Sequence, residues 1–330
     1  MALHYYRKEL GFTLVEVMIA MVLGLVLIGG VTGVFIANQT TYRVNEALST
    51  MQENARTAFL LMARDIRSAG FSGCTNNGSV SNVLNNAGAQ WWTNWQANQA
   101  GILGYTAATV PAALGAPAPV NDSEAIQLMF GGGNSVSVHD HQPNASSATL
   151  FVNSNNHGLQ SGDIVMACDD DHTAIFQVTN ANVANQTVVH NAGGSQSPGN
   201  CSKGLGFPTV CTTNGTPHRF GNNAMLTRFE AVGWYIGAAN GVRSLYRATP
   251  RRTAGTSNTA LATDEILRGV ERLTFRYIES TNTALRAANN VANWADVVGV
   301  EVQLQMVAPA NVQLAADALT FSYMINLRNR

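Results

Sequence analysis

The sequence lacks the motifs that would identify a catalytic or cofactor-binding site. It contains no Gly-x-Ser-x-Gly elbow, no His-Glu-x-x-His pair, no phosphate-binding loop and no dinucleotide fingerprint. Residues 131–133 are three consecutive glycines, but no Lys-Ser or Lys-Thr follows them, so we interpret them as a turn. We therefore expect neither an enzyme nor a bound cofactor.

Charge is also scarce along this chain. Charged residues make up 12% of the 330 residues, and the formal net charge is −1. Binding to nucleic acid phosphates needs a basic surface, so nucleic acid is not expected as a main partner. Arg251 and Arg252 lie side by side in a polar stretch, which we interpret as a solvated loop.

Proline is absent from residues 12–69, and residues 12–37 are apolar except for one acid, Glu16. A helix needs roughly 20 apolar residues to cross a bilayer core about 30 Å thick. The apolar stretch meets that requirement. An acid inside a membrane costs roughly 2.5–3.5 kcal/mol or more, so Glu16 needs a partner or a function.

The helical pattern continues beyond the apolar stretch, although the composition becomes polar. Apolar residues recur every three or four positions, which places them along one stripe of a helix. Glycines at 70 and 73 supply the expected end of that helix. The stripe is formed by Val44, Leu48, Met51, Ala55, Phe59, Met62, Ile66 and Ala69.

The start of the apolar stretch carries a specific motif. The run that begins at Gly11 reads Gly-Phe-Thr-Leu-Val-Glu-Val-Met-Ile-Ala, and it follows a short head with Arg7 and Lys8. This pattern resembles the class III signal of type IV pilins and pseudopilins. The resemblance implies cleavage between Gly11 and Phe12 by a prepilin peptidase, and methylation of the new amine of Phe12. It also implies that Glu16 pairs with the amino terminus of a neighbouring subunit. A plain membrane anchor is the alternative.

Four cysteines are present, and all lie beyond the apolar stretch. An even number of cysteines on the exported side of a membrane suggests two disulfides, and four cysteines allow three pairings. We favour Cys74 with Cys168 and Cys201 with Cys211, and free buried thiols are the alternative. No pair has the C-x-x-C spacing of a zinc or redox site.

Beyond Cys74 the sequence indicates a β-rich head. Residues 75–120 and 191–222 are loop-rich, and the first stretch contains Trp91, Trp92 and Trp95, which we expect to fix this loop to the core rather than form a contact patch. One long helix followed by antiparallel strands gives an α+β fold. The expected strands are residues 125–130, 135–139, 149–152, 163–167, 173–179, 187–190, 225–236, 242–247, 273–278, 297–307 and 319–327.

An acidic run is formed by Asp169, Asp170 and Asp171, and His172 follows it. Clustered carboxylates suit calcium, but the run lacks the spacing of an EF-hand loop. A solvated turn between two strands is the interpretation that we favour over a cation site.

Two histidines, His139 and His141, are separated by one residue at the end of an expected strand. Side chains two apart on a strand share a face, so the pair has the spacing of a metal site. No third ligand is evident, and we favour surface histidines. We expect no metal.

Later phrases extend the resemblance to minor pilins of the PilW type. These phrases are residues 65–71, 174–178, 244–247, 269–277 and 326–330. The resemblance implies a pilin-like fold with four parts, listed here by residue number. They are a leader (1–11), a membrane or fibre-core half of the helix (12–37), an amphipathic half (38–70) and a periplasmic or extracellular head (71–330).

The function implied is assembly of a type IV pilus, within a priming or tip complex that supports adhesion, twitching motility or DNA uptake. The implied partners are the prepilin peptidase, other minor pilins, the major pilin, the inner membrane and its pilus assembly platform. The protein would reside in the bacterial inner membrane with its head in the periplasm before it enters the pilus. The alternatives are a minor pseudopilin of a type II secretion system and a membrane-anchored periplasmic enzyme or binding protein.

Overall fold

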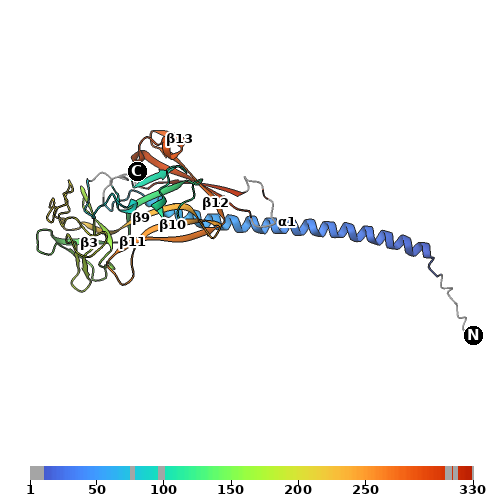
Figure 1. Ribbon diagram of the computed structural model, residues 1–330, viewed down its shortest axis with the longest axis horizontal. Helices are drawn as coiled ribbons and strands as arrows, with labels where there is room; N and C mark the ends of the chain where they lie inside the picture. The colour runs from blue at the N-terminus through green and yellow to red at the C-terminus, as the bar shows by residue number, and fades with distance from the viewer. Residues whose placement is uncertain (1–10, 75–78, 96–100, 309–313, 315–318, 329–330) are drawn as a thin grey trace, which may run out of the picture.

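In the computed structural model, one helix of 55 residues, α1 (Leu14–Ser68), carries a β-rich head on its C-terminal part (Figure 1). The structure describes residues 11–74, 79–95, 101–308, 314 and 319–328. The expected leader lies almost wholly outside these residues, as do the last two residues of the chain. At 1.5 Å per residue α1 is about 80 Å long.

The limits of α1 follow from local chemistry at its two ends. Thr13 caps the first turn together with Glu16, in the reciprocal arrangement of a capping box. At the other end, Gly70 and Gly73 have φ angles of +78° and +105°, which side chains disfavour. The helix predicted from the apolar periodicity is therefore confirmed.

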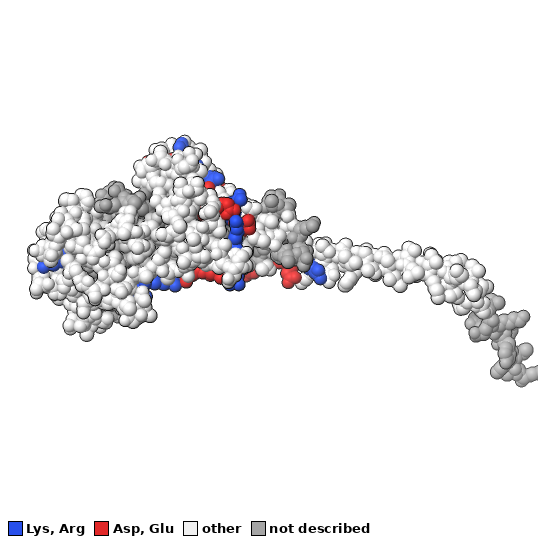
Figure 2. All heavy atoms as spheres, in the orientation of Figure 1, with Lys and Arg blue, Asp and Glu red and all other residues white. Residues whose placement is uncertain are grey.

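The two halves of α1 differ in what surrounds them. The apolar half is long and apolar enough to cross a membrane, and none of its most apolar window is buried in the structure. Figure 2 shows no Lys, Arg, Asp or Glu on the visible face of this half. The second half buries one face in the head. The buried residues of that face are Met51, Ala55, Ala58, Met62, Ala63, Asp65 and Ile66.

The larger of two sheets has eleven strands in the described part of the chain. Its main path runs β1-β6-β5-β9-β3-β4-β8-β7, with β10 paired to β9 and β11, and β2 paired to β3. Only the β1–β6 pair is parallel among these. The strands are β1 (Ser79–Asn82), β2 (Ile102–Tyr105), β3 (Ala125–Gln142), β4 (Thr149–Val152), β5 (Ile164–Cys168), β6 (His172–Gln177), β7 (Asn180–Asn182), β8 (Thr187–Val189), β9 (Met225–Ala239), β10 (Val242–Arg252) and β11 (Thr259–Arg268).

The smaller sheet is antiparallel and has the order β13-β12-β14-β15. In β14 the apolar residues Val300, Val302 and Leu304 are fully buried and alternate with half-buried polar ones, as the sequence predicts. The sheet packs on α1, where the rings of Phe59 and Tyr323 stack 4.0 Å apart. Its strands are β12 (Val270–Glu279), β13 (Asn282–Arg286), β14 (Val297–Met306) and β15 (Thr320–Asn326).

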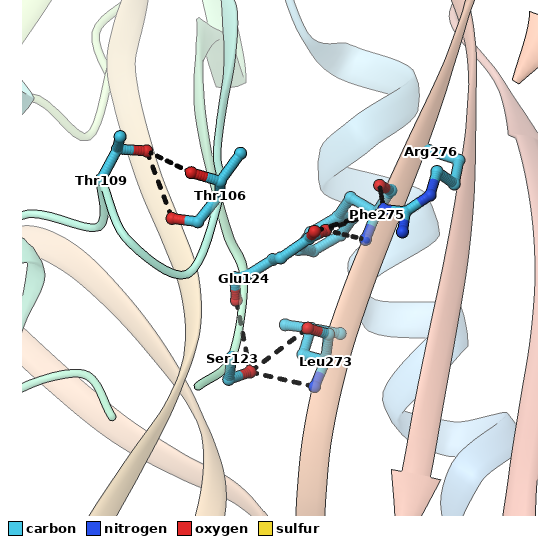
Figure 3. A network of polar contacts seen from close by, with 7 residues as sticks. All are labelled: Thr106, Thr109, Ser123, Glu124, Leu273, Phe275 and Arg276. Atoms are coloured by element: carbon cyan, nitrogen blue, oxygen red, sulfur yellow. Dashed lines mark hydrogen bonds and ion pairs between the residues drawn. The ribbon is translucent and has the colours of Figure 1, made fainter. Parts of the chain in front are cut away.

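The segment that leads into β3 connects the two sheets through side chains (Figure 3). Ser123 Oγ donates to the carbonyl of Leu273 at 3.2 Å and accepts from its N–H at 3.0 Å. The Glu124 carboxylate accepts from Phe275 N at 2.7 Å and pairs with Arg276 at 3.2 Å. Through these contacts the segment before β3 bonds to β12 much as a neighbouring strand would. They therefore fix the position of the larger sheet relative to the smaller one.

The largest apolar cluster contains the buried face of α1 and residues from both sheets, including Trp234, Phe275 and Tyr277. A separate cluster contains Trp92 and Trp95, with exposed fractions of 5% and 4%. These two tryptophans fix their loop to the sheet, as expected.

Several sequence-based expectations about the head are wrong. Residues 131–133 form part of β3 rather than a turn, so the two strands expected at 125–130 and 135–139 are one. Gly131 N donates to the carbonyl of Phe71 at 2.6 Å, and glycine is favoured here because a Cβ would lie 2.8 Å from Thr227 Cγ2.

Other strands lacked a recognisable pattern. The loop-rich stretch 75–120 contains β1 and β2, and the strands β7, β11 and β13 were also missed. Arg251 and Arg252 lie in β10 rather than in a loop, because β10 extends to pair with β11. Arg251 forms an ion pair with Asp264 across these two strands.

Candidate functional site

The N-terminal motif lies at the exposed start of α1. The Glu16 carboxylate accepts hydrogen bonds from Thr13 N at 3.1 Å and Thr13 Oγ1 at 3.2 Å, and Glu16 N donates to Thr13 Oγ1 at 3.3 Å. Phe12 is 86% exposed, and apart from the chain neighbours of Gly11 no atom of the described residues lies within 4 Å of the position that a Cβ on Gly11 would take. The Gly11–Phe12 bond is thus open, and the carboxylate lies one helical turn beyond it.

An exposed apolar surface follows directly from this motif. Large apolar side chains point outward around α1, and the head covers none of them. Such a surface requires lipid or other apolar helices as its surroundings. The residues are Leu14, Val15, Val17, Met18, Ile19, Met21, Val22, Leu23, Leu25, Val26, Leu27, Ile28, Val31, Val34, Phe35 and Ile36.

A buried ion pair fixes the other end of α1 to the head. Asp65 is 2% exposed, and its Oδ2 atom lies 2.7 Å from Arg247 Nε in β10 and 3.2 Å from Trp234 Nε1 in β9. Burying a carboxylate is unfavourable unless it is paired and hydrogen-bonded, and here it is both. Sequence analysis missed this contact. The available signal was an acid in register with the apolar stripe, three residues after Met62.

Two disulfides brace the head. Cys74 is bonded to Cys168, with 5.8 Å between the Cα atoms, and Cys201 to Cys211, with 4.9 Å. These are the two pairs that the sequence favoured. The first links the segment just after α1 to the end of β5, and the second closes a loop of the head.

The two histidines near the end of β3 do not share a face. Val138 pairs with Val152, but Asp140 pairs with Phe151, so the register shifts at His139. As a result His139 is exposed and His141 is 1% exposed, which makes the surface interpretation wrong for His141. The shift removes the spacing on which a His139–His141 metal site would depend.

The buried partner of His141 is another histidine, His190. Their Nε2 atoms lie 2.9 Å apart, and Phe220 N donates to His141 Nδ1 at 3.1 Å. His141 Nδ1 therefore carries no proton, so in the neutral pair His141 Nε2–H donates to His190 Nε2. Burial lowers the pKa of His141 to about 4 and lowers that of His190 well below its usual value.

The acidic run forms the turn between β5 and β6. One oxygen from each of Asp169, Asp170 and Asp171 lies within 4.8 Å of the others. Asp169 accepts from His172 N at 3.0 Å and pairs with His218 Nε2 at 2.8 Å, while Asp170 and Asp171 are exposed. The acidic run is therefore an exposed turn between two strands, in which Asp169 is held by contacts with His172 and His218.

Comparison with protein families finds a match at the N-terminal motif. The family model described as a prokaryotic N-terminal methylation motif matches residues 6–32. Neither the curated proteins nor the solved structures gave a match to this chain.

The matched motif and the fold agree on the class of protein. The motif marks a prepilin-type class III signal, and one long helix packed on a mostly antiparallel head is consistent with a type IV pilin-like α+β fold. Together they support a type IV pilin- or pseudopilin-type protein, anchored in a membrane by its single N-terminal helix. The motif further implies processing by a prepilin peptidase and incorporation with other pilins.

Proposed function

We propose that this protein is a minor pilin of the PilW type that takes part in type IV pilus assembly, within a priming or tip complex. The observation that carries the proposal is the exposed apolar half of α1. Its only acid is Glu16, which lies one helical turn beyond the Gly11–Phe12 bond. Before assembly the protein sits in the bacterial inner membrane with its head in the periplasm. Its pilus then serves adhesion, twitching motility or DNA uptake.

Assembly proceeds by helix packing in this proposal. Cleavage after Gly11 leaves an amine on Phe12, and the apolar halves of neighbouring helices bundle in the fibre core. In the isolated chain the Glu16 carboxylate receives hydrogen bonds from Thr13 but has no positive partner among the described residues. A neighbouring Phe12 amine would neutralise it, and the pairing would set the register between subunits.

The head acts as an interaction module in this proposal, without catalysis. The ion pair of Asp65 with Arg247 and the Cys74–Cys168 bond fix the head to the stalk, so that contacts made by the head are transmitted to the fibre. The expected partners are other minor pilins, the major pilin and the inner-membrane assembly platform.

A minor pseudopilin of a type II secretion system is the second candidate, because pseudopilins carry the same N-terminal motif. Deletion of the gene separates the two functions. A pilus role predicts fewer surface pili by electron microscopy with normal secretion of folded enzymes, and complementation should restore the pili. A secretion defect with normal piliation would instead assign the chain to the secretion system. An unchanged strain in both assays would contradict both functions.

A further inference from the structure

A cleft opens in the larger sheet where one edge of β9 changes partners. Residues 225–228 of β9 pair with β5, and residues 233–239 pair with β10. Between these two stretches, residues 229–232 have no strand on that side. The cleft lies in this gap and has a volume of about 450 Å³, which falls within the range of small-molecule sites.

Charged side chains from β9, β10 and the segment before β5 line the cleft. Four of the chain's 19 basic residues are among them, although the charge content of the whole protein is low. Figure 2 shows charges of both signs along the lower edge of the head, where β10 and β11 lie in Figure 1. The charged lining consists of Arg228, Arg247, Arg251, Arg252, Asp163 and Glu230.

Three of the four guanidinium groups are neutralised by carboxylates. Arg228 pairs with Asp163 at 3.0 Å, Arg247 pairs with Asp65 at 2.7 Å, and Arg251 pairs with Asp264. Arg252 differs, because its guanidinium donates to the carbonyl of Thr256 at 3.1 Å and meets no carboxylate among the described residues. The cleft therefore offers one positive charge to a ligand.

Glu230 lines the cleft together with these arginines, and within the part of the chain that the structure describes its carboxylate lacks a hydrogen-bond donor. Its side chain is half-buried in the cleft, and no group within the described ranges donates a hydrogen bond to it. Burial raises the pKa of this carboxyl, with Asp65 acting in the same direction and Arg247 and Arg228 opposing it. Its oxygens reach solvent, and the hydroxyl groups of a ligand would donate the hydrogen bonds that the described part of the protein does not supply.

We propose that this cleft binds an acidic saccharide, whose single acid group pairs with Arg252 and whose hydroxyls donate to Glu230. A cationic ligand would be repelled by the Arg252 guanidinium, and a ligand with several acid groups would find one unpaired guanidinium and the Glu230 carboxylate. A neutral sugar would leave Arg252 without its partner. Thr249 and Gln160 add neutral polar groups to the wall, and Pro250 adds an apolar face.

This binding site is independent of pilus assembly, so its test uses the purified full chain in detergent micelles. Saturation-transfer NMR would compare glucuronic acid with glucose, which lacks the acid group, and with acetate, which lacks the ring hydroxyls. We expect saturable binding of glucuronic acid, about two- to fivefold tighter than that of glucose or acetate, since Arg252 is exposed and an exposed ion pair contributes up to about 1 kcal/mol. Equal binding of glucose or of acetate would overturn the assignment.

Two variants locate the contact in the cleft. Arg252→Gln should weaken binding of glucuronic acid about two- to fivefold, and Glu230→Gln should weaken it by a smaller factor because an amide oxygen still accepts a hydrogen bond. Arg268→Gln is the matched control, because Arg268 is exposed on β11 and pairs with Glu265 outside the cleft. Unchanged binding in both cleft variants, or an equal loss in the control, would refute the proposal. Circular dichroism of each variant verifies that the head is folded.

Discussion

Asp65 near the end of α1 and Arg247 in β10 form an ion pair of 2.7 Å, although 182 residues separate them in the sequence. Asp65 is 2% exposed and the Arg247 side chain is 16% exposed. Trp234 Nε1 also donates to this carboxylate, whose other oxygen lies 3.4 Å from Arg64 Nη2, and the Arg247 guanidinium lies 6.0 Å from the Trp234 ring centroid. The three residues join α1, β9 and β10 at one point.

Removing the charge of Asp65 should destabilise the head. Asp65→Asn leaves the partly buried guanidinium of Arg247 without its carboxylate, and we expect a cost of about 2–3 kcal/mol, below the value for a fully buried pair. Urea unfolding of the full chain in detergent, followed by tryptophan fluorescence, measures the change. Asp264→Asn is the control, since it breaks the exposed pair with Arg251 and should cost less than about 1 kcal/mol. Equal effects of the two substitutions would contradict the structural role of Asp65.

Glu16→Ala should leave membrane insertion intact but impair assembly. The substitution removes an acid from an apolar segment, so insertion becomes easier, and the cleavage bond is untouched. A loss of about 1.4 kcal/mol per subunit contact would reduce incorporation about tenfold. Immunogold labelling of sheared pili measures incorporation, and intact mass reports leader removal and methylation. Glu46→Ala, on the exposed polar half of α1, is the matched control. Normal incorporation of the Glu16 variant would contradict pairing as the source of register.

The head should lose stability in acid because of His141 and His190. The pKa of His141 is lowered from 6.5 to about 4 in the folded state, so the unfolded chain binds more protons in between. Stability is therefore complete above about pH 6.5 and falls as the pH is lowered toward 4, by up to roughly 3 kcal/mol from this residue.

Melting temperatures at a series of pH values between 7.5 and 4.5 check this dependence. His141→Gln removes one titrating ring and should flatten the curve in that range. His139→Gln should leave the curve unchanged, because His139 is exposed on the same strand. If melting temperature depended on pH equally in the wild type and both variants, the buried histidine pair would not be responsible for the loss of stability.

The two disulfides should contribute unequally to stability. Cys74 and Cys168 are 94 residues apart, and Cys201 and Cys211 are 10 apart. In the chain-entropy description, the longer loop stabilises by roughly 2 kcal/mol more than the shorter one. Urea unfolding of the two double Cys→Ser variants measures the difference. An equal or reversed order would show that local contacts rather than loop entropy decide the effect.

The sequence predicts the helices and strands whose apolar residues recur at a regular spacing within the element itself. The regular apolar spacing of α1 and the alternation of Val300, Val302 and Leu304 in β14 reflect burial against one neighbour each, so each pattern is visible within its own segment. The strand β11 (Thr259–Arg268) has no buried face of that kind, since only Thr259 in it is buried. Its position depends on β10, which the local pattern does not reveal.

The missed contacts share a long separation in sequence. His141 and His190 are 49 residues apart, and in the folded chain their buried Nε2 atoms form a hydrogen bond with each other. The register shift at His139 reverses the side of the strand that a simple alternation assigns to His141. The spacing of His139 and His141 in the sequence predicted a shared face. The pairing of β3 with β4 instead places the two side chains on opposite faces.

The bond between Cys74 and Cys168 determines how a mechanical pull on the stalk reaches the head. It attaches the chain just beyond α1 to β5, which has β6 on one side and β9 on the other. If the protein is part of a fibre, tension on the stalk would reach an interior strand, whose hydrogen bonds to β6 and β9 would have to break together. In a head attached through an edge strand, the hydrogen bonds between that strand and the sheet would instead break one after another.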